Sequence, residues 1–197
     1  MISIKHNELS AGVAFDNYTL SSEHTSDGRF INVYTVLGQL IHDLKYSDSS
    51  LDSQKKIINK VISIIDENFR KIDFLRLNNL ILVPAPSTKQ KDFSTVVELV
   101  KKMSEYFDIP FLNSFSKLTC IFAKRLPHGI EFSEDDFTWN GPMPNNTSIC
   151  IVDDIYGEGK TLTALIRLIR KNANISPIYY LSIVKTRNHG MTQDGML

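Results

Sequence analysis

Residues 148–165 contain the side chains and glycines whose types and spacing could do chemistry, in the order SICIVDDIYGEGKTLTAL. The apolar run 149–152 is typical of a strand buried on both faces of a parallel sheet. Asp153 and Asp154 follow where that strand is expected to end, and Gly157 and Gly159 then permit a tight turn. A helix is expected next, because apolar residues recur at helical spacing: Leu162, Leu165, Ile166 and Ile169.

This order of elements predicts a site with two kinds of contact. A glycine loop that leads into a helix N-terminus aims several backbone N–H groups at one point, which suits a phosphate group. The acidic pair beside the loop would repel a phosphate, so we expect it to face hydroxyl groups or a cation. A ribose 5-phosphate offers hydroxyls and a phosphate at about the required separation.

The same stretch has two other interpretations. Gly159-Lys160-Thr161 matches the end of a Walker A loop, but that motif requires a glycine where this chain has Asp154. The second alternative is an ordinary strand-to-helix turn with acids on its surface. The ordered run from the apolar strand through Thr161 favours the phosphate site over both.

The bulk composition is that of an ordinary globular protein. The 197 residues are 42% hydrophobic and 22% charged, and a chain of this length suits one α/β domain with an elaboration, or two small lobes at most. Lys and Arg number 22, as do Asp and Glu, so the zero net charge does not indicate a nucleic-acid partner. We expect Cys120 and Cys150 to be buried thiols.

We see no signal peptide and no apolar stretch of roughly 18 residues, so we expect a soluble cytoplasmic protein without a membrane partner.

The remaining elements must position the site. We expect short strands in residues 1–30, helices over 33–46, 57–69 and 93–107, and strands over 80–83, 118–122 and 178–184. Residues 80–84, 149–153 and 178–184 should be parallel neighbours, with the loop 153–161 at the carboxyl edge of the sheet. The long irregular segment 123–147 is typical of a lid or binding loop.

The stretch 149–162 resembles the phosphoribosyl-pyrophosphate (PRPP) motif of type I phosphoribosyltransferases. The resemblance implies an α/β fold with a parallel-sheet core over 79–197 and a small, variable N-terminal lobe of helices and strands over 1–78. It also implies that Asp153 and Asp154 hold the ribose hydroxyls. The substrate-binding residues that it implies around the 5-phosphate are Tyr156, Gly157, Glu158, Gly159, Lys160 and Thr161.

Two further segments resemble the competence protein F (ComF) branch of this family. They are Ile41-His42-Asp43-Leu44-Lys45-Tyr46 and Pro84-Ala85-Pro86-Ser87. The family uses the loop after the first core strand to hold pyrophosphate and places a mobile loop near residue 123. The resemblance and the chemistry of the side chains together imply pyrophosphate contacts from Ser87, Lys89, Lys91, Lys124 and Arg125. For each of Lys89 and Lys91, a solvated surface lysine is an equal alternative.

The implied reaction transfers ribose 5-phosphate from PRPP to a nitrogen nucleophile and releases pyrophosphate, with Mg²⁺ held mainly through PRPP. The chain departs from the family at Glu158, where members usually have Thr or Ser. From this departure we expect Glu158→Thr to tighten binding, unless Glu158 points to solvent or pairs with Lys160. The alternative function is a non-catalytic module that senses PRPP or a nucleotide, or one that only mediates interactions. The acceptor and the oligomeric state stay open, a homodimer included.

Overall fold

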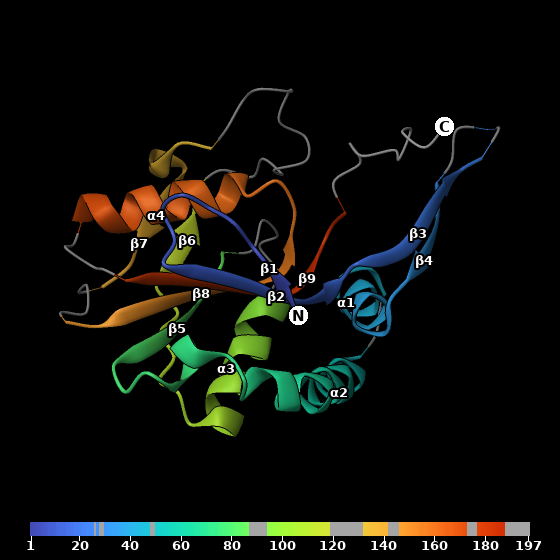
Figure 1. Ribbon diagram of the computed structural model, residues 1–197, viewed down its shortest axis with the longest axis horizontal. Coiled ribbons are helices and arrows are strands. Elements are labelled where there is room, and N and C mark those ends of the chain that lie inside the picture. Colours follow the sequence, from blue (N-terminus) through green and yellow to red (C-terminus); the bar gives the residue numbers. More distant parts are fainter. Residues whose placement is uncertain are drawn as a thin grey trace, which may run out of the picture.

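The chain folds into an α/β structure around a mostly parallel central sheet (Figure 1). The computed structural model describes residues 1–25, 27, 30–47, 50–86, 94–118, 132–141, 146–172 and 177–187. The strands are β1 Ile2–Ser3, β2 Ala11–Asn17, β3 Thr19–His24, β4 Phe30–Tyr34, β5 Leu80–Pro84, β6 Phe115–Lys117, β7 Phe137–Trp139, β8 Ser148–Tyr156 and β9 Ile178–Lys185. The α-helices are α1 Val36–Tyr46, α2 Leu51–Phe69, α3 Thr95–Phe107 and α4 Lys160–Asn172, with short 3-10 turns at Asp73–Arg76 and Glu134–Asp136.

Within the described residues the central sheet has five strands in the order β1-β2-β9-β8-β5. Strands β5, β8 and β9 are parallel neighbours, with Leu80 opposite Ser148 and Ile149 opposite Ile178. The expected adjacency of these three strands is therefore confirmed. The carboxyl ends of β8 and β9 meet at one edge of the sheet, because parallel strands run in the same direction.

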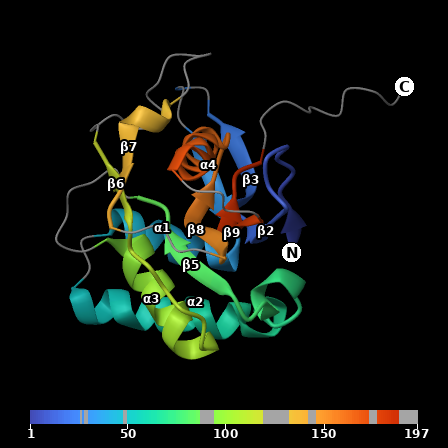
Figure 2. The same ribbon diagram turned by 90° about the vertical axis from the view of Figure 1, so that its left-hand side faces the viewer.

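Helices cover both faces of this sheet. Helices α1, α2 and α3 lie on one face, and α4 with the β6–β7 hairpin lies on the other (Figures 1 and 2). The core residues of β8 are fully buried as a result: Ile149, Cys150, Ile151 and Val152. Cys150 is a buried thiol, as expected. Burial on both sides explains why the sequence of β8 shows no alternation of apolar and polar residues.

The N-terminal segment contributes to the same sheet. Strand β2 pairs in parallel with β9, with Val13 opposite Leu181, and β1 pairs antiparallel with β2. The central sheet therefore contains strands from both sides of the boundary expected at residue 78. The β3–β4 hairpin forms a separate sheet that projects from the body of the molecule (Figure 1).

The structure refines the predicted elements. Helix α1 begins at Val36 and α2 at Leu51, where Thr35 and Ser50 cap their first turns. The predicted helix over 93–107 is α3, which begins at Thr95. Residues 119–122 of the strand predicted over 118–122 lie outside the described residues. The β6–β7 hairpin was not predicted, because each of its strands has three residues and shows no periodicity.

Helix α1 is docked closely against the turn between β2 and β3. The Thr35 hydroxyl donates to the Asn17 carbonyl at 2.6 Å and accepts from the Gly38 N–H at 2.9 Å. A Cβ atom at Gly38 would lie 1.9 Å from the Tyr18 carbonyl oxygen, far closer than a Cβ approaches an atom to which it is not bonded. Glycine at position 38 therefore sets how near α1 approaches the sheet.

We predict that Gly38→Ala destabilises the protein by about 1–3 kcal/mol, because the new methyl group meets backbone that must move. In an unhindered helix the same change would stabilise by about 1 kcal/mol. Urea unfolding measures the difference, and Gly157→Ala is the matched control, since a Cβ there meets nothing within 4 Å. A Gly38→Ala protein as stable as the parent would contradict the close docking of α1.

Candidate functional site

The acidic pair lies inside strand β8 and not at its end. Asp153 is opposite Ser182 and Ile155 is opposite Val184, so β8 continues to Tyr156 along β9. The expectation that the strand ends at Asp153 was wrong, because backbone pairing with β9 extends it. On the other side, the pairing of β5 ends with Pro84 opposite Val152. The two carboxylates therefore stand immediately beyond the end of β5, at the carboxyl edge of the sheet.

Asp154 is buried and ion-paired with a helix on one face of the sheet. Only 2% of the residue is exposed, and its Oδ1 atom lies 2.8 Å from the Nζ atom of Lys45 in α1. Its Oδ2 atom is buried as well and has no hydrogen-bond partner among the described residues. Burial lowers the pKa of Lys45, but the charges of Asp154 and Asp153 outweigh burial and raise that pKa overall, so the ammonium stays charged.

Asp153 is partly exposed and has different partners. Its Oδ1 atom accepts from the Asp154 N–H at 2.8 Å, and the Tyr180 hydroxyl donates to Oδ2 at 3.4 Å. Burial and then the nearby charge of Asp154 raise the pKa of Asp153 to about 7, against the opposing effect of Lys45. Near neutral pH this carboxyl group is therefore partly protonated, and its ability to accept hydrogen bonds depends on pH.

The glycine loop begins directly after β8. Gly157 has open space around it, and Gly159 has a φ of +79°, in the left-handed region that glycine adopts without strain. Helix α4 begins at Lys160, and the Thr163 N–H donates to the Gly159 carbonyl at 2.9 Å. The Tyr156 hydroxyl lies 3.0 Å from where a Cβ of Gly159 would stand. A helix therefore begins directly after the glycine loop, as predicted.

Glu158 does not point into the site. Its side chain is 79% exposed, and its Oε2 atom lies 3.1 Å from the Nζ atom of Lys160, which is itself largely buried. Both conditions under which Glu158 was expected to matter little are therefore met. Thr161, the last predicted residue of the loop, is half-buried in the first turn of α4.

Lys45 is the site residue that sequence reasoning missed. It is 109 positions from Asp154, and no local pattern joins the two. The one available signal was the segment 41–46, whose Leu-Lys-Tyr ending carried the resemblance but was given no role. Five predicted site residues lie outside the described residues: Ser87, Lys89, Lys91, Lys124 and Arg125. The same holds for residues 123–131 and 142–145 of the predicted lid over 123–147, whereas its described part contains the 3-10 turn Glu134–Asp136 and strand β7.

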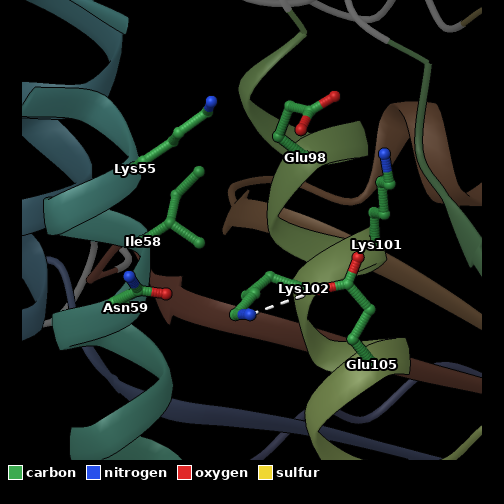
Figure 3. A pocket seen from close by; sticks show the side chains of 7 residues that line it. All are labelled: Lys55, Ile58, Asn59, Glu98, Lys101, Lys102 and Glu105. Atoms are coloured by element: carbon green, nitrogen blue, oxygen red, sulfur yellow. Dashed lines mark hydrogen bonds and ion pairs between the residues drawn. The ribbon is translucent and has the colours of Figure 1, made fainter. Parts of the chain in front are cut away.

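No group of three or more metal-ligating side chains occurs in the part of the chain that the structure describes. No described helix is long and apolar enough to cross a membrane. A hollow of about 260 Å³ lies between α2 and α3 (Figure 3). None of the predicted site residues lines this hollow. The residues that line it are Lys55, Ile58, Asn59, Glu98, Lys101, Lys102 and Glu105. This hollow is therefore distinct from the acidic pair.

Comparisons with known proteins were made for sequence and for structure. No protein-family model matches the chain, and no curated protein matches it either. Among solved structures it is similar to adenine phosphoribosyltransferase from Giardia lamblia complexed with 9-deazaadenine, with a TM-score of 0.44, 12% identity, and 85% of this chain and 93% of that chain covered. The chain is also similar to adenine phosphoribosyltransferase from Trypanosoma brucei in complex with AMP, pyrophosphate and ribose-5-phosphate. The TM-score is 0.43 and the identity 11%, with 85% of this chain and 87% of that chain covered. For orotate phosphoribosyltransferase from Aeropyrum pernix the TM-score is 0.39 and the identity 15%, with 85% of this chain and 76% of that chain covered. Likenesses of this size carry no argument about activity.

The raised pKa of Asp153 predicts how stability varies with pH. The unfolded carboxyl group titrates near 3.8 and the folded one near 7, so the folded state binds more protons between these values. The contribution of Asp153 is fully present below pH 3.8 and is lost as pH rises through 7, by at most about 1.4 kcal/mol per pH unit. Asp153→Asn should flatten this fall, measured as the free energy of unfolding between pH 5 and 8. An equal slope in parent and variant would show that Asp153 titrates normally.

Proposed function

We propose that the protein binds PRPP and transfers its ribose 5-phosphate to a nitrogen nucleophile, with release of pyrophosphate. The observation that supports this most is the juxtaposition in the last residues of β8 and the loop after it. A carboxylate pair, an open glycine loop and a helix N-terminus follow one another within residues 153–160, at the carboxyl edge of a parallel sheet. Such an edge is where ligands bind in open α/β sheets.

The proposed roles follow from exposure and partners. Asp153, the more exposed carboxylate, accepts hydrogen bonds from the ribose hydroxyls. The backbone N–H groups of residues 157–161 contact the 5-phosphate, which Glu158 does not obstruct because it points to solvent. Asp154 pairs with Lys45 beside the proposed sugar site. Pyrophosphate contacts are assigned to Ser87, Lys89, Lys91, Lys124 and Arg125 on the resemblance and their chemistry.

The chemical step breaks the bond between ribose C1 and a pyrophosphate oxygen, and the electron pair leaves with pyrophosphate. The nitrogen nucleophile then forms the new bond to C1, and its proton passes to solvent water. Positive charge develops on the ring between these events, and the negative charge of the acidic pair favours it. Mg²⁺ would neutralise the leaving pyrophosphate, held by the oxygens of the ligand. The pair itself does not suit a metal, because the Lys45 ammonium is already paired with the Oδ1 atom of Asp154.

A second candidate function is binding of PRPP or a nucleotide without turnover. Two observations favour it. Asp154 is 2% exposed beneath Lys45, so only one carboxylate of the pair faces an incoming sugar. The loop also lacks the hydroxyl that Thr or Ser would provide at position 158. Pyrophosphate release in the presence of PRPP, Mg²⁺ and a panel of bases separates the two candidates. Binding without release selects the second.

We predict that Asp153→Asn weakens PRPP binding by about 10- to 100-fold at pH 8. A hydrogen bond to a charged acceptor contributes about 1.5–3 kcal/mol, and the amide that replaces it is a poorer acceptor. Isothermal titration calorimetry with Mg²⁺ measures the effect, and the unfolding midpoint shows that the variant is folded. Unchanged affinity in the folded variant would remove Asp153 from the sugar site.

Glu158→Thr provides the matched control within the loop. Its carboxylate is exposed and paired with Lys160, and an exposed ion pair contributes about 0–1 kcal/mol. We therefore predict that the dissociation constant for PRPP changes by less than about fivefold. A gain of two orders of magnitude would mean that Glu158 turns toward the phosphate when the ligand arrives.

A further inference from the structure

The Lys45 ammonium occupies the place where two adjacent carboxylates would ordinarily attract a divalent cation. Asp153 and Asp154 are neighbours on β8, and oxygen ligands of this kind are those that Mg²⁺ and Mn²⁺ prefer. Here the cation beside them comes from the protein, since the Nζ atom of Lys45 lies 2.8 Å from the Oδ1 atom of Asp154. The other oxygen, Oδ2, is buried and has no partner among the described residues.

We propose that Lys45 is a specificity-determining residue that reserves the Asp153–Asp154 pair for a hydroxyl-bearing ligand and excludes divalent cations from it. The identity of that ligand as a ribose rests on the proposed function, whereas the exclusion of a cation does not. Lys45 is a positioning residue in this scheme. It acts on the ligand through Asp154 and not by contact with reacting atoms.

Charge and hydrogen bonding explain the selection. A divalent cation at the pair would be repelled by an ammonium within a few ångströms, and it would have to take Oδ1 of Asp154 from that ammonium. A sugar hydroxyl is a neutral donor and needs only a free acceptor oxygen. The partly exposed carboxylate of Asp153 is such an acceptor, and Lys45 does not bind it in the structure. The lysine therefore leaves Asp153 open to hydroxyls and opposes the binding of a metal at the pair.

The lysine is held in place by the packing of α1. Its side chain is one-third exposed, and the preceding residue, Leu44, is buried in the core. The start of the helix is fixed by Thr35 and by the close approach at Gly38. The ammonium is thus delivered to the pair by a docked helix, which distinguishes it from a freely moving surface lysine.

Several phenols in the described part of the chain lie around the pair. The charge of Asp154 contributes to raising the pKa of Tyr18 and of Tyr180, and the ring of Tyr156 contacts that of Tyr180. Tyr46 contributes to raising the pKa of Lys45. Burial raises the pKa of the Tyr18 and Tyr180 phenols above its ordinary value, so both are neutral between pH 5 and 8. Among the described residues, Lys45 is the cation that pairs with Asp154, and the pKa of Asp153 lies within this range.

The test uses the full chain without any sugar ligand, with Mn²⁺ as the probe. Lys45→Met removes the charge at similar length, and Lys45→Arg retains it. We expect Lys45→Met to bind Mn²⁺ at least about tenfold more tightly than the parent by electron paramagnetic resonance at pH 8, because a repelling charge at short range has been removed. Lys45→Arg should behave like the parent. Adding Asp153→Asn to Lys45→Met should abolish the gain, which would place the metal at the pair.

Three results would overturn the proposal. They are a folded Lys45→Met protein with no gain in Mn²⁺ binding, a parent protein whose own Mn²⁺ binding is lost in Asp153→Asn, and a gain in Lys45→Arg equal to that in Lys45→Met. Lys45→Gln serves as the neutral variant if Lys45→Met does not fold. A carboxyl NMR titration of Asp153 adds a readout, since its pKa should rise in the neutral variants and not in Lys45→Arg. Failure of the parent to bind PRPP would refute the proposed function alone.

Discussion

The buried carboxylate of Asp154 is the constraint on which the rest of the structure depends. It lies on β8 beneath α1, where an unpaired charge would be strongly destabilising, and Lys45 is the cation that neutralises it. Removing one partner of a buried pair typically costs about 3–5 kcal/mol, so helix and strand require each other. Helix α1 thus stabilises the charge of Asp154 at the carboxyl edge of the sheet.

This constraint ties the N-terminal segment to the site. Strand β2 pairs with β9, and α1 follows the β3–β4 hairpin back across the sheet to present Lys45. The close approach at Gly38 and the cap at Thr35 determine where the helix lies. A segment that sequence analysis separated as a variable lobe therefore provides a charge that the acidic pair needs.

Local patterns in the sequence predicted the framework. The apolar runs of β5, β8 and β9 indicated buried parallel strands, and the glycine loop before α4 indicated a helix N-terminus beside two acids. Contacts between distant segments could not be predicted in this way. The Lys45–Asp154 pair joins residues 109 positions apart, and the extension of β8 to Tyr156 depends on backbone pairing with β9. The outward direction of Glu158 depends on a side-chain rotamer and on the neighbouring Lys160.

The central claim is that the glycine loop and the acidic pair form one sugar-phosphate site. Backbone amide NMR during separate titrations with ribose 5-phosphate and inorganic phosphate tests it most directly. We expect inorganic phosphate to shift the amide signals of residues 157–163 alone, and ribose 5-phosphate to shift these together with Asp153 and Asp154. Saturable shifts confined to the α2–α3 hollow around Lys55 and Lys101, or no saturable shifts with either ligand, would contradict the claim.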